Sequence, residues 1–377
     1  MPQTIVCGNG SIAELADILT NINSKKFMLV CDSSFPFLSI KDQINKQTVP
    51  FVSFGDFTPN PLYEDVVKGV DVFKCERCDA IVAVGGGSSI DVAKCIKLYC
   101  HMDPTQNYLK QEYKDTKVPL IAIPTTAGTG SESTRYAVIY YEGKKQSVAH
   151  ESIVPDYAIL ESAVLKTLPL YQKKCTMLDA LCQGIESWWS VNSTDESKMY
   201  SKIAVETIMA NYKAYIFDND DKAAEHIMLA SNYAGRAINI TQTTAGHAMS
   251  YKMTSMYKLP HGHAVAICLP CVWRFMCDHL DLCIDARGGG YLKTIFLDIS
   301  AAMQCDSIQQ AIHTFEMLLD ELQMERPNMQ QKDIDILVSS VNTVRLSNNP
   351  IKLSADDLEL LYSSIQKGCA DKPQQHA

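Results

Sequence analysis

The stretch A-I-V-A-V-G-G-G-S-S-I-D-V-A-K, residues 80–94, predicts how the first half of the chain folds. Its first five residues are all apolar, which is typical of a strand buried on both faces of a parallel sheet. Three glycines follow, and residues 92–98 then have a helical pattern. A strand, a glycine loop and a helix in this order can hold a phosphate, because glycines allow close approach and the helix start offers free N–H groups. A tight turn without a ligand has the same pattern, so the loop alone leaves both interpretations open.

Further strands alternate with helical segments on either side of this stretch. We expect them at residues 5–7, 27–31, 51–54, 118–124 and 155–160, with a hairpin around Gly143. Such alternation predicts an α/β layer with a mostly parallel sheet. After residue 163 the strand signals disappear and helical periodicity dominates. We therefore expect an α/β domain at residues 1–163 and an all-α domain at residues 164–377.

Composition limits the class of protein. A chain of 377 residues, 46% hydrophobic and 20% charged, is long enough for two globular cores. Its net charge of -9 argues against nucleic acid and anionic membranes as partners. The N-terminus lacks the pattern of a signal peptide, and the longest apolar run, near residues 264–273, is too short to cross a bilayer. These features predict a cytoplasmic protein.

The 14 cysteines are scattered along the chain, which fits thiols in a reducing cytoplasm. Two C-x-x-C pairs, Cys75 with Cys78 and Cys268 with Cys271, leave a four-cysteine zinc site as a minor alternative.

Polar residues at strand ends are candidates for a nucleotide site. Asp32 follows a buried strand, where a carboxylate can bind an adenosine ribose and repel a 2'-phosphate, favouring NAD over NADP. It could equally be a helix cap. The hydroxyl-rich run at residues 125–134 suits phosphate or ribose contacts, although a polar surface loop has the same composition. The candidate cofactor residues are Asp32, Gly85, Gly86, Gly87, Ser88, Ser89, Asp91, Thr125, Thr126 and Thr129.

Two segments of the second half could hold a metal. Asp179 and Gln183 are four residues apart and share one face of a helix. His247 and His261 flank a segment downstream, and imidazole is the commonest protein metal ligand. Two oxygens and two imidazoles would make a four-ligand site for a divalent cation. Histidines that are only structural would give the same spacing.

Several motifs together resemble the iron-dependent (group III) alcohol dehydrogenase family over nearly the whole chain. They include G-N-G-S-I from Gly8, P-N-P at 59–61, V-G-G-G-S-S-I-D-V-A-K at 84–94, P-T-T-A-G-T-G-S-E at 124–132, L-D-A-L at 178–181, A-G-H-A-M at 245–249 and L-P-H-G at 259–262. The resemblance implies a Rossmann-like NAD(P)-binding domain, a helical metal domain and a cleft between them. It assigns Asp179, His247 and His261 to family ligand positions.

Two positions depart from the family pattern. Gln183 stands where the family usually has histidine, and an amide oxygen is the weaker ligand. Tyr251 stands where many members have another histidine, and we expect it to pass a proton or to shape the pocket. The resemblance implies Fe²⁺ as the habitual metal, and Zn²⁺ is equally compatible with these ligands. It also implies a homodimer or a larger homo-oligomer.

The predicted reaction is the NADH-dependent reduction of an aldehyde whose carbonyl the metal polarises. The segments at residues 178–193 and 345–350 most resemble phosphonoacetaldehyde and sulfoacetaldehyde reductases, so we expect a small anionic aldehyde. Its anion would need a cation, for which Arg236, Lys252 and Arg135 are candidates. Each could instead be a solvated or ion-paired surface charge.

Three alternatives remain at this point. One is a general short-chain alcohol dehydrogenase of the same family, which needs no cationic pocket. Another is a metal- and NAD-dependent lyase of the dehydroquinate-synthase type. The last is a protein that binds the nucleotide without catalysis.

Overall fold

The computed structural model describes residues 3–341 and 343–367 and forms two compact units. Unit 1 consists of Met1–Pro169 and Lys213–Asn239, and unit 2 of Leu170–Tyr212 and Ile240–Ala377. The predicted combination of an α/β half and a helical half is confirmed. The division at residue 169 lies close to the expected border at 163, but the return of Lys213–Asn239 to unit 1 was not expected.

Unit 1 is built on a six-stranded parallel sheet. In spatial order its strands are β1 (Thr4–Cys7), β8 (Tyr157–Leu160), β5 (Leu120–Pro124), β4 (Ala80–Gly85), β2 (Phe27–Cys31) and β3 (Phe51–Phe54). The strands β2, β4 and β5 are buried throughout, as their continuous apolar sequences predict. Because all strands are parallel, the residues that follow these three strands lie at one edge of the sheet.

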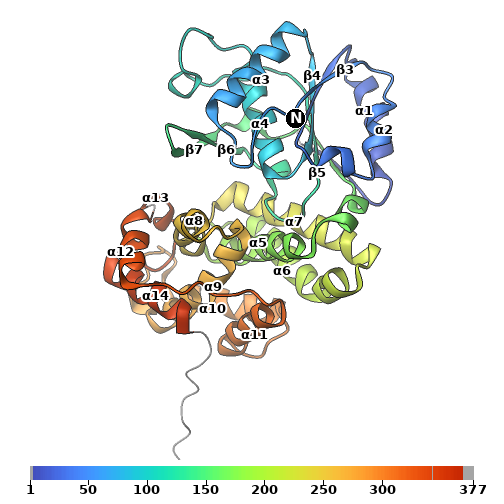
Figure 1. Ribbon diagram of the computed structural model, residues 1–377. Helices are drawn as coiled ribbons and strands as arrows, with labels where there is room; N and C mark the ends of the chain where they lie inside the picture. Colours follow the sequence, from blue (N-terminus) through green and yellow to red (C-terminus); the bar gives the residue numbers. More distant parts are fainter. Residues whose placement is uncertain (1–2, 342, 368–377) are drawn as a thin grey trace, which may run out of the picture. The chain divides into compact units, whose positions relative to one another are not determined.

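Helices cover both faces of this sheet (Figure 1). They are α1 (Glu14–Asn21), α2 (Lys41–Asn45), α3 (Tyr63–Cys75) and α4 (Gly87–Tyr99). The crossovers reverse direction after β3, which places α1 and α2 on one face and α3 and α4 on the other (Figure 1). The expected hairpin is present as β6 (Tyr136–Tyr141) and β7 (Lys144–Ala149).

Helix α7 (Asp221–Thr241) explains why a segment far along the chain belongs mostly to unit 1. A side chain at Gly235 would come within 2.6 Å of the carbonyl oxygen of Gly130, so only a glycine allows this approach. Asn232, one turn before, donates to the buried Glu132 at 3.1 Å. Helical periodicity marks such a segment as a helix but does not show which core it joins.

Unit 2 is helical in its described residues, apart from a single β-bridge between Cys283 and Ile351. Its helices are α5 (Leu170–Trp189), α6 (Asp195–Lys213), α8 (Ala245–Tyr257), α9 (His261–Asp278), α10 (Gly288–Ala302), α11 (Ile308–Glu321), α12 (Gln331–Ser340), α13 (Thr343–Leu346) and α14 (Ala355–Lys367). Helix α9 is almost wholly buried and packs against α5 and α8. These three helices carry the candidate metal ligands.

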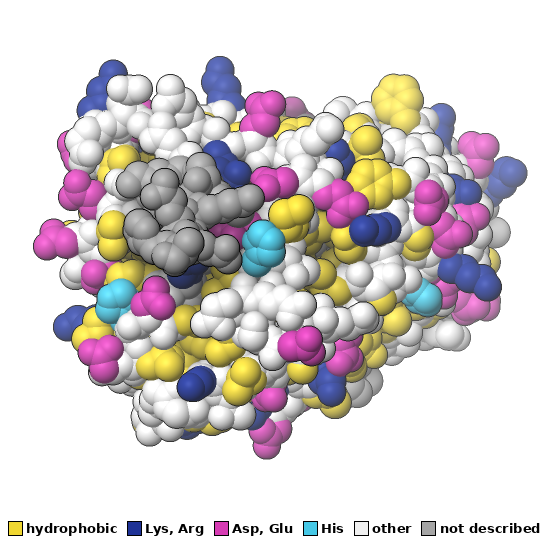
Figure 2. Space-filling view, turned by 90° about the horizontal axis from the view of Figure 1, so that it is seen from below, with side chains coloured by type: hydrophobic (Ala, Val, Ile, Leu, Met, Phe, Trp, Pro, Cys, Tyr) yellow, Lys and Arg dark blue, Asp and Glu magenta, His cyan; other side chains and the backbone are white. Residues whose placement is uncertain are grey.

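The surface carries side chains of both charges. Figure 2 shows acidic and basic groups interspersed with apolar ones over one face. Across the described ranges, no helix combines the length and the apolar character that a membrane span requires.

Candidate metal centre and nucleotide loop

Three predicted ligands converge in unit 2. One ligand atom each from Asp179, His247 and His261 lies within 4.8 Å of the other two. Asp179 and His247 are buried, and His261 is half-buried. They come from α5, α8 and α9, so the packing of three helices assembles the site.

The distances in this group fit a bound cation. His247 Nε2 and Asp179 Oδ1 are 3.4 Å apart. Both atoms are buried and neither makes a hydrogen bond of normal geometry, which is costly for a site without a ligand. Two ligands on a tetrahedral ion with bonds of about 2.1 Å are separated by roughly 3.4 Å. A carboxylate oxygen and two imidazole nitrogens are ligands that iron and zinc both accept.

Glu186 orients the central histidine of this group. Its fully buried carboxylate accepts hydrogen bonds from His247 Nδ1 at 2.8 Å, from His247 N at 3.0 Å and from Thr244 N at 2.8 Å. A proton on Nδ1 leaves the Nε2 lone pair toward Asp179, where a metal would take it. Our sequence reasoning missed Glu186, although it lies seven residues after Asp179 and three after Gln183, on the same helix face.

The charges of the site stabilise one another without a cation. Burial alone would lower the pKa of His247, but the carboxylates of Glu186 and Asp179 raise it to about 9. Burial alone would raise the pKa of Asp179, yet His247, His261 and a hydrogen bond from Gln183 hold it below its ordinary value. Both shifts show that the surroundings of His247 and Asp179 favour a positive charge at this group.

Two glycines allow the ligand helices to approach closely. A side chain at Gly262, beside His261, would collide with the Cys175 carbonyl and come within 2.8 Å of Asp179 Cβ. A side chain at Gly246, beside His247, would collide with the Glu186 carboxylate. Both glycines have ordinary helical positions, so close packing and not backbone conformation requires them.

The structure places Gln183 at the same group. Its side chain is buried on α5, and a hydrogen bond from it helps to lower the pKa of Asp179. Its carbonyl oxygen Oε1 is buried and accepts no hydrogen bond. An amide in this position can supply a fourth, weaker ligand. That role stays a prediction.

Tyr251 lies beside the metal ligands. Its ring stacks on that of His261, with centroids 5.7 Å apart and an interplanar angle of 2°. Burial raises the pKa of Tyr251, which keeps the hydroxyl protonated near neutral pH. By contrast, both ring nitrogens of His263 are hydrogen-bonded, to Tyr171 Oη at 2.7 Å and to the Glu325 carbonyl at 2.8 Å. His263 is therefore structural.

The predicted nucleotide residues gather at one edge of the unit 1 sheet. Gly85 has a φ of +152°, and any side chain there would collide with Ser89 Oγ. Ser89 donates to Asp32 at 3.1 Å. Thr125 N donates to the Gly85 carbonyl at 3.0 Å, which ties the hydroxyl-rich segment after β5 to the loop after β4. Methyl-sized groups at Gly86 and Gly87 would contact Thr126 and Thr129.

Two more of the proposed cofactor residues, Asp91 and Ser88, have local partners. The half-buried Asp91 accepts from Ser131 Oγ at 2.7 Å and from Val138 N at 2.9 Å, so it fixes the segment that enters β6. The hydroxyl of Ser88 accepts weakly from Asn60 N at 3.4 Å. The hydrogen bonds of Asp91 within the protein are sufficient to explain an aspartate at this position, without a contact to a nucleotide.

The candidate cations have different environments. Arg135 and Arg236 belong to unit 1, where Arg135 pairs with Glu151 and Arg236 lies over the ring of Tyr233. Lys252 is in unit 2, and its side chain is exposed although it follows Tyr251 in sequence.

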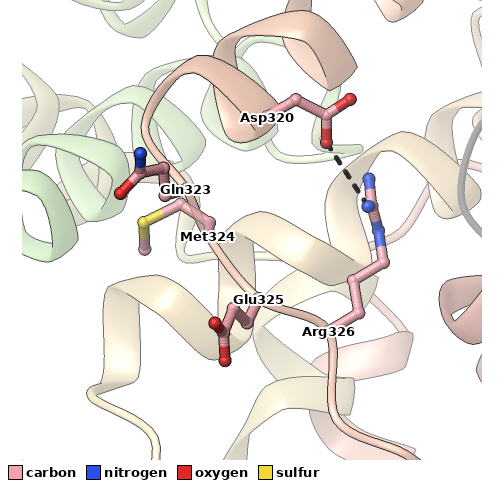
Figure 3. Close-up of a pocket in the computed structure, with 5 residues that line it drawn as sticks. All are labelled: Asp320, Gln323, Met324, Glu325 and Arg326. Atoms are coloured by element: carbon pink, nitrogen blue, oxygen red, sulfur yellow. Dashed lines mark hydrogen bonds and ion pairs between the residues drawn. The ribbon is translucent and has the colours of Figure 1, made fainter.

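The described residues also include a shallow hollow of about 250 Å³, lined by Asp320, Gln323, Met324, Glu325 and Arg326 (Figure 3). Arg326 and Asp320 pair across it at 3.5 Å. None of these residues belongs to the candidate metal group, so the hollow is not part of that site. The cysteines of the C-x-x-C pairs, likewise, are not part of the metal group and carry free thiols.

Comparison with known proteins now identifies the family. The profile of the iron-containing alcohol dehydrogenases matches residues 2–162, and the C-terminal profile of the same family matches residues 174–366. The chain belongs to the iron-containing alcohol dehydrogenase family. The predicted class, a metal-containing alcohol dehydrogenase, is therefore confirmed. The first profile ends at residue 162 and the second begins at residue 174.

Individual proteins of known name are similar to this chain. The chain is 31% identical over 284 residues to NAD-dependent methanol dehydrogenase of Bacillus methanolicus, covering 73% of this chain and 74% of that one. It is 28% identical to alcohol dehydrogenase 4 of Schizosaccharomyces pombe over 97% of its length and 88% of the relative's. Sulfoacetaldehyde reductase from Bifidobacterium kashiwanohense, solved with NAD⁺, has a TM-score of 0.87 and 25% identity, with 97% of each chain covered.

Proposed function

We propose that this iron-containing alcohol dehydrogenase uses NADH and a divalent metal to reduce a small anionic aldehyde, such as sulfoacetaldehyde or phosphonoacetaldehyde, to the alcohol. The observation that carries the reductase assignment is the buried donor group of Asp179, His247 and His261, with His247 oriented by Glu186. The substrate class is supported by the similarity to the sulfoacetaldehyde reductase.

The residues of the metal centre have distinct tasks in this proposal. Asp179, His247 and His261 would hold the cation, with Gln183 as a fourth ligand. When bound, the cation supplies a Lewis acid that polarises the aldehyde carbonyl, and NADH supplies the hydride. Glu186 keeps the Nδ1 proton of His247 in place, so that Nε2 remains available. Tyr251 would donate the proton that completes the alcohol, directly or through water.

The loop residues of unit 1 would bind the cofactor. Gly85, Gly86 and Gly87 open the start of α4 to phosphate oxygens, and α4 is long enough for its dipole to favour an anion there. The carboxylate of Asp32 would contact the adenosine ribose and repel a 2'-phosphate. NAD-dependence is supported by the named function of the methanol dehydrogenase relative.

The setting of the enzyme is a further part of the proposal. The cysteines of the described residues all carry free thiols, which suits a reducing compartment such as the cytoplasm. A homo-oligomeric state rests on the family resemblance alone.

The test is the loss of NADH absorbance with a panel of short aldehydes. Sulfoacetaldehyde and phosphonoacetaldehyde are compared with acetaldehyde and propanal, using protein loaded with Fe²⁺ or Zn²⁺ in parallel. We expect turnover that needs the metal and a higher kcat/KM for the anionic substrates. Equal kcat/KM values for all four aldehydes would instead identify a general short-chain alcohol dehydrogenase. No NADH oxidation with any of them would refute the reductase assignment and favour a lyase or a binding protein.

A further inference from the structure

The segment R-L-S-N-N-P, residues 345–350, packs against the start of the helix that carries His247. Asn348 is buried and donates to the Thr243 carbonyl at 3.2 Å and to Gln242 Oε1 at 3.3 Å. Helix α8 begins two residues after Thr243, at Ala245. The segment is thereby fixed beside the metal-binding end of α8, although about a hundred residues separate the two in sequence.

Arg345 is the charged residue of this segment. Its side chain is half-buried, and Nη1 donates to Gln242 Oε1 at 3.2 Å. The same oxygen accepts from Asn348, so Gln242 links the guanidinium to the fixed part of the segment. A held guanidinium loses less conformational freedom when it binds a ligand than a solvated lysine does.

Helix packing places the segment of Arg345 beside the helix of Tyr251. Arg345 belongs to α13, which packs against α8, the helix that carries both His247 and Tyr251. The ring of Tyr251 in turn stacks on His261, whose ring is 5.4 Å from that of His247. Arg345 therefore lies on a helix that contacts the helix of Tyr251 and His247 within unit 2.

The sequence-based candidates for a substrate cation fit this place less well. Lys252 is exposed, Arg135 pairs with Glu151 and lies over the ring of Tyr136, and Arg236 lies over the ring of Tyr233. In a two-carbon aldehyde only one carbon separates the carbonyl from the anionic group. The cation that recognises the anion must therefore lie close to the metal ligands, and Arg345 is held by Gln242 just before the helix that carries His247.

We propose that the guanidinium of Arg345 binds the sulfonate or phosphonate group of the substrate beside the metal centre and thereby selects anionic aldehydes. This inference rests on the proposed function and names the residue responsible for its substrate class. A guanidinium presents paired N–H donors that match two oxygens of such an anion. Arg345 would act in binding and would leave the chemical step to the metal, NADH and Tyr251.

The experiment compares Arg345→Gln, Arg345→Lys and the control Arg77→Gln, at an exposed arginine, with the unchanged enzyme. Each is assayed with sulfoacetaldehyde, phosphonoacetaldehyde and the uncharged propanal. We expect Arg345→Gln to raise KM for both anionic substrates about 100-fold and to leave the constants for propanal within about threefold. Arg345→Lys keeps the charge but loses the fork, so its KM should be intermediate. Arg77→Gln should match the unchanged enzyme.

A second readout does not require the anionic substrate to turn over. Ethanesulfonate, an unreactive anion, should inhibit propanal reduction competitively, and Arg345→Gln should raise its inhibition constant by a similar factor. Metal content and the circular dichroism spectrum show whether each variant is folded, and a misfolded Gln variant is replaced by Arg345→Met. Arg345 is excluded if the anionic and uncharged substrates lose activity equally, or if neither KM nor the inhibition constant changes.

The two proposals fail in different ways. If none of the aldehydes tested causes the unchanged enzyme to oxidise NADH, the proposed function is refuted before any variant is compared. If it prefers anionic aldehydes and Arg345→Gln keeps that preference, only the role of Arg345 is refuted, and the proposed function stands.

Discussion

The carboxylate of Glu186 and the Nδ1 atom of His247 are joined by a hydrogen bond of 2.8 Å inside the core of unit 2. Glu186 also accepts from the backbone N–H groups of Thr244 and His247. One carboxylate thus fixes both the ring orientation of the central ligand and the start of the helix that carries it. Carboxylates in this position tune metal sites through the ligand they hold.

Replacing Glu186 with glutamine should lower metal affinity by about 10- to 100-fold, because a neutral amide stabilises the Nδ1 proton of His247 less than a carboxylate does. Competition with a coloured chelator measures the affinity. The matched control is Glu206→Gln, which changes an exposed glutamate on α6. Equal affinity in Glu186→Gln and the unchanged enzyme would show that Glu186 does not orient His247.

Replacing Gln183 tests the departure from the family pattern. Gln183→His should raise metal affinity by about tenfold, because imidazole is a stronger ligand for iron and zinc than an amide oxygen. Gln183→Leu should lower it, because the fourth ligand is removed from a buried site. The same chelator competition applies. A leucine variant with unchanged affinity would mean that the amide is no ligand.

Gly262→Ala should destabilise unit 2 and remove metal binding. The added methyl group would collide with the Cys175 carbonyl and press on Asp179, so α9 must move away from α5. Overpacking of this kind typically costs about 1–3 kcal/mol or more. Gly290→Ala is the control, since a methyl group there meets nothing within 4 Å. Thermal unfolding and metal content are measured on both variants. We expect Gly290→Ala to keep the stability and the metal content of the unchanged protein.

Asp32→Asn should relax the choice of cofactor. The amide keeps an acceptor for the Ser34 N–H, which Asp32 now binds at 2.8 Å, but it removes the negative charge. We expect the ratio of kcat/KM for NADPH to that for NADH to rise about tenfold or more, corresponding to roughly 1.4 kcal/mol of repulsion relieved. The exposed Asp42→Asn serves as the control. An unchanged ratio would leave Asp32 as a turn residue only.

Lys94 should make stability depend on pH in the alkaline range. Its ammonium group is fully buried and donates to Ser131, Thr134 and the Tyr136 carbonyl. Burial outweighs the attraction of Asp91 and Glu132 and lowers the pKa of Lys94 from 10.5 to about 8.

Between these two pH values the unfolded chain holds a proton at Lys94 that the folded chain releases. A penalty of roughly 3 kcal/mol is therefore present below pH 8 and is lost as the pH rises toward 10.5. Denaturant unfolding of the unchanged protein and of Lys94→Met at both pH values tests this. The stability of the unchanged protein relative to the variant should increase with pH, and a constant difference would contradict the lowered pKa.

Local sequence patterns were sufficient to predict the strands and helices whose pattern lies within one stretch of the chain. The apolar run of β4 followed by three glycines gave the strand, the loop and the start of α4, because a buried parallel strand must be apolar on both faces. The spacing of Asp179 and Gln183 placed both on one face of α5, because that face repeats with the helical period. Motifs shared with the family then assigned the histidines.

Other features of the structure depend on contacts between segments that are far apart in sequence. Glu186 lies on the buried face of α5, as many other residues of this helix do. Only the packing of α5 against the start of α8 makes it the partner of His247. Arg345 resembles a surface charge in sequence, and the contacts of its segment with residues 242–243 place it beside the start of α8. Segment 213–239 has the pattern of any amphipathic helix, and the glycine contact with Gly130 assigns it to unit 1.

The sequence by itself determined the α/β and helical halves and the order of strand, glycine loop and helix at β4 and α4, because each depends on periodicity or on a motif contained in one segment. The candidate metal ligands came from the resemblance to the family. Only the tertiary structure decided which carboxylate orients His247 and which basic segment packs beside the start of α8. The physical reason is that hydrogen bonds and charge interactions act over a few ångströms in space, and sequence periodicity within one helix carries no information about which other helix will lie within that distance.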